Sequence, residues 1–288
     1  MRFLEHRIGD RRVLRLVAKW LKAGVMEEGA WTEGTEGTPQ GAVISPLLAN
    51  IYLHYVYDLW VDQWRKRRAT VEAIVIRYAD DTVVGFQRHA DAERFLRDLR
   101  GRLATFGLAL HPEKTRLIEF GRFAAQRRSV KGLGKPETFD FLGFTHICGK
   151  RQDGKFILVR HTIAKRMRAK LLEIKETLYR MCHLPVPEQG RWLGQVVRGY
   201  FAYHAVPTNS RRTTSFAYHV VWHWRRALMR RSQKAFVPWR RMTLLAARWI
   251  PSARIRHPWP QARFLVQHPR WEPSALAAHA RICPGGAG

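Results

Sequence analysis

The chain has 288 residues, an ordinary share of apolar residues and a formal net charge of +28. This length and composition allow one large domain or two modest ones with an apolar core, and they exclude a disordered chain. No apolar run reaches the roughly eighteen residues of a membrane span, and the three scattered cysteines form neither a disulfide framework nor a zinc-binding spacing. We therefore expect a cytoplasmic protein that does not enter a membrane.

The positive charge is concentrated in the second half of the chain. Residues 1–150 contain 25 Lys and Arg against 18 Asp and Glu, whereas residues 151–288 contain 26 against 5. Such a segment repels itself unless a polyanion neutralises it, so nucleic acid is the expected partner. An anionic membrane surface and an rRNA-coating tail are the alternatives, but both usually involve Lys-rich or low-complexity segments. Seven of the eleven tryptophans lie in this Arg-rich half, which favours RNA with unstacked bases.

Hydrophobic periodicity and turn residues predict an α+β front half. Ser45 and Pro46 predict the N-cap and the first turn of a helix, and Asp10 falls inside an earlier helix. In chain order, the expected elements are a helix over 3–22, a loop or irregular hairpin over 24–41, a helix over 45–68, two buried strands with a tight turn over 72–86, a helix over 89–106, short strands at 108–110 and 116–120, a basic linker over 122–135, and a hairpin with strands at 138–148 and 155–160.

From Thr162 onward the pattern is helical only. The expected helices cover residues 162–182, 190–204, 213–234 and 238–248, and a loosely ordered tail follows over 251–288. We therefore divide the chain into an α/β segment (1–150), a basic helical segment (151–250) and the tail.

The stretch VIRYADDTVVGF (residues 75–86) places two acids, Asp80 and Asp81, at the turn between two apolar strands. Two adjacent carboxylates on a rigid turn repel each other unless a cation lies between them, and Mg²⁺ is the cation that carboxylate oxygens suit best. Neighbouring side chains on a strand point to opposite faces, so the two acids are unequal ligands and a third carboxylate is needed. A solvated Asp-Asp turn is the alternative interpretation.

A second motif, GTPQGAVISPLLANIYLHY, covers residues 37–55. Its turn places the Gln40 amide and the backbone at Gly41 beside an open surface, immediately before the helix that begins near Ser45. Taken alone, this motif indicates only the entry of a helix.

The two motifs together resemble the palm of reverse transcriptases. Their residues are similar to those of the enzymes encoded by group II introns, the maturases. HPEKTRLIEFGRFA (111–124) resembles the palm motif that follows, and FDFLGF (139–144) resembles the primer-grip hairpin. Residues 192–209 and 222–231 are similar to the thumb and the maturase-specific region. The resemblance covers roughly residues 1–280.

This resemblance implies RNA-templated DNA synthesis with Mg²⁺ and assistance to intron splicing. The implied partners are group II intron RNA, an RNA template with a DNA primer, and deoxynucleoside triphosphates. Asp80 would be the main Mg²⁺ ligand and Asp81 the weaker one. The other implied positions are the nucleotide and template pocket (Gln40 and Gly41), the incoming triphosphate (Lys114) and the primer end (Leu142 and Gly143).

In the helical segment, Trp192, Val196, Val197 and Tyr200 have the spacing of core residues, whereas Arg198 and Tyr203 are expected to face RNA. Repeated pairs of basic residues are expected to form a surface that contacts successive phosphates of the RNA backbone. These pairs are Arg211–Arg212, Arg225–Arg226, Arg230–Arg231 and Arg240–Arg241.

The palm of this family begins with a strand that carries a further Asp, and this sequence shows no such strand before Phe3. Asp10 does not replace it, because it lies beside Arg11 and Arg12 inside the expected first helix. We therefore expect the chain alone to polymerise weakly or not at all unless an N-terminal fragment is supplied in trans. A non-catalytic maturase remnant that binds intron RNA is the alternative function, and a non-functional remnant of a mobile element is a third.

Overall fold

The computed structural model describes residues 1–22, 25–27, 30–32 and 44–260. The chain divides into two compact units, Met1–Leu117 and Ile118–Gly288, and each is considered by itself. Both contain helices and small antiparallel sheets, in agreement with the expected α+β class. Within the described ranges, no helix has the length and apolar character needed to cross a bilayer.

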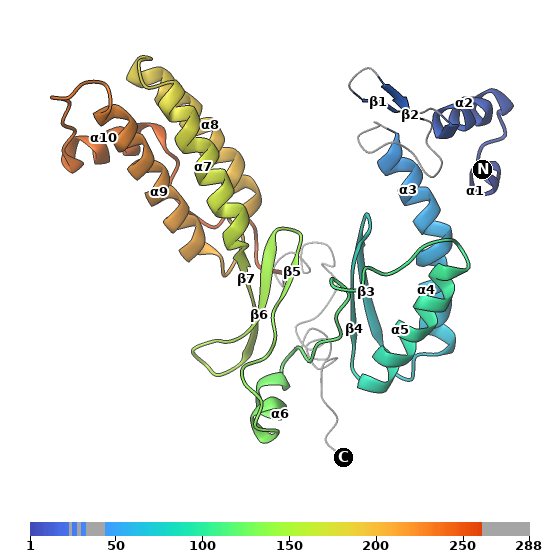
Figure 1. Cartoon of the computed structure of the whole chain (residues 1–288). Coiled ribbons are helices and arrows are strands. Elements are labelled where there is room, and N and C mark those ends of the chain that lie inside the picture. Colours follow the sequence, from blue (N-terminus) through green and yellow to red (C-terminus); the bar gives the residue numbers. More distant parts are fainter. Residues whose placement is uncertain (23–24, 28–29, 33–43, 261–288) are drawn as a thin grey trace, which may run out of the picture. The chain divides into compact units, whose positions relative to one another are not determined.

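The first unit packs helices on one face of a two-stranded hairpin (Figure 1). The strands pair as β1 with β2 and β3 with β4, both antiparallel. Its elements are α1 (Arg2–Glu5), α2 (Arg11–Lys22), β1 (Val25–Glu27), β2 (Ala30–Thr32), α3 (Ser45–Leu53), the π-helix η1 (His54–Asp58), α4 (Leu59–Arg67), β3 (Ala73–Tyr78), β4 (Asp81–Phe86) and α5 (His89–Ala104).

The core of this unit lies between η1, α4 and α5. Phe95, Leu99 and Leu103 recur every four residues along α5, and all three are buried, as their spacing predicts. Trp64 packs edge-on against Phe95 at 5.0 Å between ring centroids, and its indole N–H donates to Asp98 at 2.8 Å. This core covers the hairpin face that carries Val75, Val84 and Phe86.

Several expectations for the first unit are wrong. The single helix over 3–22 is two helices, because the Asp10 carboxylate accepts the backbone N–H of Arg12 at 2.7 Å and so caps the start of α2. Ile44 stands at the N-cap of α3, so Ser45 is already helical, while Pro46 lies in the first turn as expected. Residues 108–110 and 116–120 are irregular rather than strands. Leu108 and Leu110 nevertheless pack against the core without forming a ladder.

The hairpin is also less buried than expected. Ile74, Ile76 and Tyr78 are more than half exposed, although β3 begins with the apolar run Ala73–Ile76. An uninterrupted apolar run predicts a strand covered on both faces, but only one face of this two-stranded sheet meets the helices.

The second unit joins a three-stranded antiparallel sheet, in the order β5-β6-β7, to a helical bundle (Figure 1). The four expected helices are confirmed. The expected linker over 122–135 contains a helix, and the expected strand over 138–148 is two strands separated by a turn. The elements are α6 (Ala124–Val130), β5 (Phe139–Phe141), β6 (Phe144–Lys150), β7 (Phe156–Thr162), α7 (Ala164–Arg180), α8 (Val186–His204), α9 (Ser210–Met229) and α10 (Trp239–Trp249).

A buried glutamine links three parts of the bundle. Gln189 on α8 donates to the carbonyls of Met181 and Leu184 at 2.8 and 3.1 Å, and so satisfies groups at the end of α7. Its side-chain oxygen accepts the indole N–H of the fully buried Trp224 on α9 at 2.9 Å. Val197 and Tyr200 are buried and Trp192 and Val196 partly so, as predicted.

Two glycines on α8 let α10 approach closely. A Cβ at Gly190 would lie 2.5 Å from the ring of Trp249, and one at Gly194 would lie 2.6 Å from the Trp249 carbonyl oxygen. A ring can turn, whereas a backbone carbonyl moves only with its helix, so Gly194 sets the minimum spacing between α8 and the end of α10.

We therefore expect Gly194→Ala to lower the free energy of unfolding of the second unit by about 1–3 kcal/mol through overpacking. Gly199→Ala on the same helix is the matched control, because a Cβ there meets nothing within 4 Å. That change should be neutral or stabilising by about 0.5–1 kcal/mol through helix propensity. Urea unfolding followed by circular dichroism measures both, and equal effects of the two variants would contradict the packing argument.

Candidate functional site

The two acids lie at the tip of the β3–β4 hairpin. Tyr78 pairs with Asp81, so Ala79 and Asp80 form a two-residue turn. Ala79 has a φ of +52°, a conformation that costs a non-glycine residue about 1 kcal/mol and is common at functional sites. Asp80 and Asp81 are both exposed. The turn therefore presents two adjacent carboxylates to solvent on a short and constrained loop.

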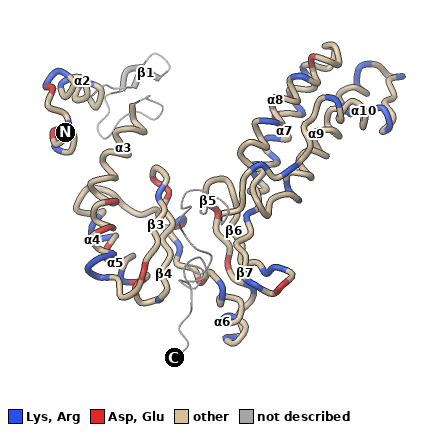
Figure 2. Tube along the Cα trace, turned by 180° about the vertical axis from the view of Figure 1, so that it is seen from behind, with Lys and Arg blue, Asp and Glu red and all other residues tan. Residues whose placement is uncertain are grey.

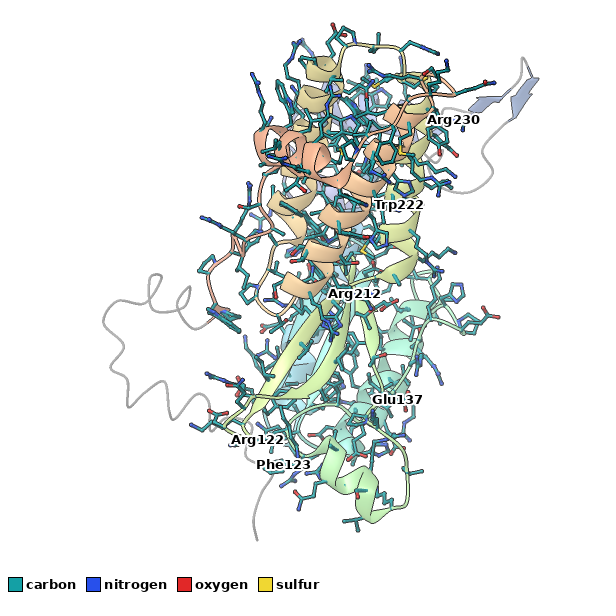
Figure 3. The ribbon with its side chains drawn as sticks, turned by 90° about the vertical axis from the view of Figure 1, so that its left-hand side faces the viewer. Arg122, Phe123, Glu137, Arg212, Trp222 and Arg230 are labelled. Carbon is teal, nitrogen blue, oxygen red and sulfur yellow. The ribbon has the colours of Figure 1, made fainter. Side chains whose placement is uncertain are left out.

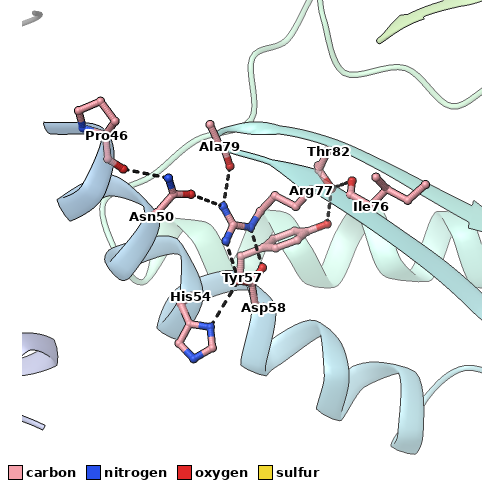
Figure 4. A network of polar contacts seen from close by, with 9 residues as sticks. All are labelled: Pro46, Asn50, His54, Tyr57, Asp58, Ile76, Arg77, Ala79 and Thr82. Carbon is pink, nitrogen blue, oxygen red and sulfur yellow. Dashed lines mark hydrogen bonds and ion pairs between the residues drawn. The ribbon is translucent and has the colours of Figure 1, made fainter. Parts of the chain in front are cut away.

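Arg77 ties this turn to the preceding helices (Figure 4). Its Nε and Nη2 atoms donate to the two carboxylate oxygens of Asp58, each at 2.6 Å. Its Nη1 donates to the Ala79 carbonyl at 2.7 Å and to Oδ1 of Asn50 at 3.0 Å. Asn50 in turn donates to the Pro46 carbonyl at 2.9 Å. One guanidinium thus connects α3, η1 and the turn that carries the acids.

The π-helix η1 contacts the hairpin through two adjacent side chains. Tyr57 and Asp58 are adjacent in sequence, yet the Tyr57 hydroxyl lies 2.7 Å from Oγ1 of Thr82 while Asp58 binds Arg77. Thr82 also donates to the Ile76 carbonyl at 3.2 Å. Short π-helical segments are rare in proteins, and those that occur often lie at functional sites.

The charges of this network favour a permanent ion pair. Burial acts to raise the pKa of Asp58, but hydrogen bonds and charge from Arg77 outweigh it and leave that pKa below its usual value. The hydrogen bonds to Asp58 raise the pKa of Arg77. Burial raises the pKa of Tyr57. The contacts that hold the turn therefore persist through the neutral pH range.

The hairpin carboxylates fit part of a magnesium site. Mg²⁺ is often held by one or two carboxylates together with substrate phosphates and water, and Asp80 and Asp81 supply such oxygens. Within the described part of the chain, no group of three or more His, Cys, Asp and Glu side chains comes together to hold a metal. Lys114 is exposed in the irregular segment after α5. Gln40 and Gly41 lie outside the described residues.

A second tight turn carries Leu142 and Gly143, between β5 and β6. Their φ values are +46° and +79°, as a type I′ turn between the paired residues Phe141 and Phe144 requires. The Tyr203 hydroxyl donates to the Leu142 carbonyl at 2.7 Å. The structure thus joins two of the predicted primer-grip and RNA-facing residues by a direct hydrogen bond.

Asn209 fixes the corner beneath that turn. This fully buried side chain accepts the backbone N–H of Thr162 at 3.0 Å and donates to Thr162 Oγ1 and to the His204 carbonyl, both at 2.7 Å. It therefore links the end of β7 to the end of α8 and the start of α9. The position of Tyr203, one residue before His204, depends on this corner.

The predicted basic pairs have unequal members. Arg225 donates through Nε to the Val237 carbonyl at 2.8 Å, and Arg231 donates to the Leu184 carbonyl. These two arginines support the bundle, whereas their neighbours Arg226 and Arg230 are exposed. Figure 2 shows Lys and Arg along the helices of the second unit. Arg212 is partly buried, and the other exposed members are Arg198, Arg211, Arg240 and Arg241.

Residues 3–146, half of the chain, match the family described as reverse transcriptase (RNA-dependent DNA polymerase). The chain belongs to the reverse transcriptase family. This confirms the resemblance that the motifs predict, and the matched segment contains the acidic turn and its Arg77 network.

Three relatives illustrate the extent of the likeness to known proteins. Protein YkfC of Escherichia coli is 32% identical over 144 residues, which cover 41% of this chain and 38% of that protein. The group II intron-encoded protein LtrA of Lactococcus lactis subsp. cremoris is 41% identical over 76 residues, 26% of this chain and 12% of LtrA. A putative COX1/OXI3 intron 1 protein of Saccharomyces cerevisiae is 24% identical over 76% of this chain and 34% of its own length. The chain thus spans well under half of each of these relatives.

Sequence reasoning identified the acids but missed the residues that hold them. Arg77 was a detectable signal, because a charged residue inside an apolar strand needs a buried partner. Asn50 and Asp58, polar residues among the apolar residues at the start of the helix expected over 45–68, were the corresponding signal for the partners of Arg77. The structure was needed to show that Arg77 binds Asp58 and Asn50, which lie nineteen and twenty-seven residues earlier in the chain.

We expect Arg77→Lys to loosen the acidic turn, because lysine keeps the charge but cannot contact Asp58, Asn50 and the Ala79 carbonyl together. Hydrogen exchange of the β3–β4 amides should accelerate about 10- to 100-fold, which corresponds to roughly 1.4–2.8 kcal/mol of local stability. Arg67→Lys on the exposed side of α4 is the control. Unchanged exchange in Arg77→Lys would show that the hairpin does not depend on this guanidinium.

His204 gives the second unit a pH dependence. Burial, with a contribution from the charge of Arg166, lowers the pKa of His204 to about 4. The unfolded state therefore binds more protons than the folded state between about pH 6.5 and 4, and stability falls as the pH decreases through that range. Allowing for partial exposure, we expect a loss of about 1–2 kcal/mol. Urea unfolding at several pH values should show a flatter profile for His204→Gln, and an unchanged profile would contradict this assignment.

Proposed function

We propose that this chain acts as a group II intron reverse transcriptase and maturase, which copies RNA into DNA and binds intron RNA to assist its splicing. The observation that carries the proposal is the Asp80–Asp81 turn, held by Arg77, in a chain of the reverse transcriptase family. The likeness to LtrA, which is named as a group II intron-encoded protein, supports the intron assignment.

In this proposal, Mg²⁺ bound at the turn would neutralise phosphate charge during nucleotidyl transfer. Asp80 supplies the main carboxylate and Asp81 the weaker one. Arg77 and Asn50 keep the turn in place and thereby position the acids without touching substrate. Lys114 meets the triphosphate of the incoming nucleotide, and the remaining pocket residues are Gln40 and Gly41.

We assign the proposed domains in chain order. Residues 1–150 form the palm, with Leu142 and Gly143 beneath the primer end. Residues 151–250 form the thumb and maturase domain, and residues 251–288 form a basic tail. The hydrogen bond from Tyr203 to Leu142 supports this arrangement, because it connects the proposed primer grip directly to the proposed RNA-binding helices.

A non-catalytic RNA-binding maturase is the second candidate. The charge distribution favours this candidate, because residues 151–288 hold 26 Lys and Arg against 5 Asp and Glu. This excess of positive charge would bind RNA even if the β3–β4 hairpin were not catalytic. Such a protein would bind intron RNA with a steep salt dependence and would not need Asp80.

Asp80→Asn tests the two candidates. The change keeps the size of the side chain and removes the charge that binds the cation, so we expect the primer extension that the chain shows on an RNA template with Mg²⁺, alone or with an N-terminal fragment supplied in trans, to fall by about 100-fold or more. The affinity for intron RNA should stay within about twofold. Asp62→Asn, which removes an exposed charge on α4, is the matched control.

Unchanged extension in Asp80→Asn would overturn the proposed role of the turn. A wild-type chain that binds intron RNA tightly but extends no primer, even with an N-terminal fragment supplied in trans, would favour the non-catalytic maturase instead. The two measurements are independent, since one follows DNA product and the other follows bound RNA.

A further inference from the structure

Helix α9 has an unusual outer face. Phe216, Val220 and Trp224 point into the core of the second unit, and none of them is exposed. Tyr218 and Trp222 recur four residues apart on the opposite side, where a surface helix normally carries polar residues. Tyr218 is 57% exposed, and Trp222, which Figure 3 labels, is partly exposed. Two large rings thus lie where the fold does not need them.

Arginines and ring stacking hold the aromatic side chains of this face in place. The Arg225 guanidinium lies 4.9 Å from the ring centroid of Trp239 on α10, and its Nε is fixed by the Val237 carbonyl. Trp239 is itself 42% exposed and lies within 12° of parallel to Tyr218, with ring centroids 6.2 Å apart. Arg226 covers Trp222 at 4.7 Å. The side chains are therefore ordered before any ligand arrives, which lowers the entropy cost of binding.

The charge around this face selects the ligand. Residues 189–260 contain fourteen Lys and Arg and no Asp or Glu. A protein partner with an ordinary mixed surface would leave these cations unpaired, whereas a polyanion would pair them. Among polyanions, a duplex keeps its bases stacked on each other, so only unpaired bases can use exposed aromatic faces.

We propose that Tyr218, Trp222, Arg225, Arg226 and Trp239, the aromatic face of α9 and α10, bind unpaired bases of single-stranded RNA by stacking. Arg226 and the exposed Arg211 contact the phosphates on either side. The inference rests on the proposed function, because it specifies how the RNA-binding half of the chain would recognise its RNA. It adds a preference for unpaired bases that basic residues alone would not confer.

The test compares two RNA probes on the purified full-length chain. Fluorescence anisotropy measures affinity for an unstructured oligo(A) RNA of about twelve nucleotides and for an RNA duplex of about twelve base pairs. We expect Tyr218→Leu to weaken oligo(A) binding by about fivefold or more and duplex binding by less than twofold, with an unchanged salt slope because no charge is lost. Tyr218→Phe, which keeps the ring, should retain wild-type affinity.

Two further variants separate stacking from charge. Arg226→Gln should weaken both probes and reduce the salt slope for oligo(A) by about 0.7. Leu244→Ala removes an exposed apolar side chain of α10 outside the aromatic face and should change neither affinity. A 2-aminopurine base within oligo(A) should be quenched on binding to wild type and less so on binding to Tyr218→Leu.

The outcomes are distinct. Equal losses for both probes in Tyr218→Leu, or no loss for either, would overturn the stacking proposal while leaving RNA binding by the chain intact. A wild-type chain that binds neither probe would overturn both this inference and the proposed RNA-binding function. Circular dichroism melts of each variant exclude a loss of fold as the cause.

Discussion

The ion pair between Arg77 and Asp58 is the contact on which the candidate site depends. A two-stranded hairpin is only marginally stable by itself, and its turn contains a non-glycine residue at positive φ. The guanidinium opposes that strain because its Nη1 holds the Ala79 carbonyl and Asn50, while its Nε and Nη2 bind Asp58. Because the partners of Arg77 lie on α3 and η1, the position of the acids is set by the helices that pack on the hairpin. The acidic turn and the helix motif are thus one structural unit.

The second unit uses the same device, in which a single polar side chain satisfies several backbone groups at a junction. Gln189 joins the end of α7 to Trp224, and Asn209 joins β7 to the corner between α8 and α9. A buried amide with all of its partners in place specifies one arrangement of the elements, since any shift leaves polar groups unpaired. The surfaces that face outward from this bundle are consequently well defined.

The sequence predicted much of this architecture because strong periodicity and turn chemistry determine local structure. Helix α5 and the four bundle helices followed from their apolar spacing, and the acidic hairpin followed from two β-branched runs around a short turn. The exposure of Ile74 and Ile76 could not be predicted, because a run of apolar residues does not state how many faces of its sheet are covered. The roles of Arg77, Gln189 and Asn209 could not be predicted either. A polar residue in a sequence shows its need for a partner but not the partner's identity, which tertiary structure decides.

The absence of any acidic residue between positions 189 and 260 also affects how long the folded protein survives. Fourteen like charges with no acidic residue in the same stretch lower the stability of the bundle by mutual repulsion, and a polyanion that binds only the folded form would restore it in proportion to the logarithm of its concentration. If the chain binds RNA as proposed, its lifetime in a cell would be coupled to the supply of that RNA. Under that proposal, a chain made without RNA would spend more time unfolded and would be degraded sooner, so the amount of protein would follow the amount of RNA without a dedicated regulator.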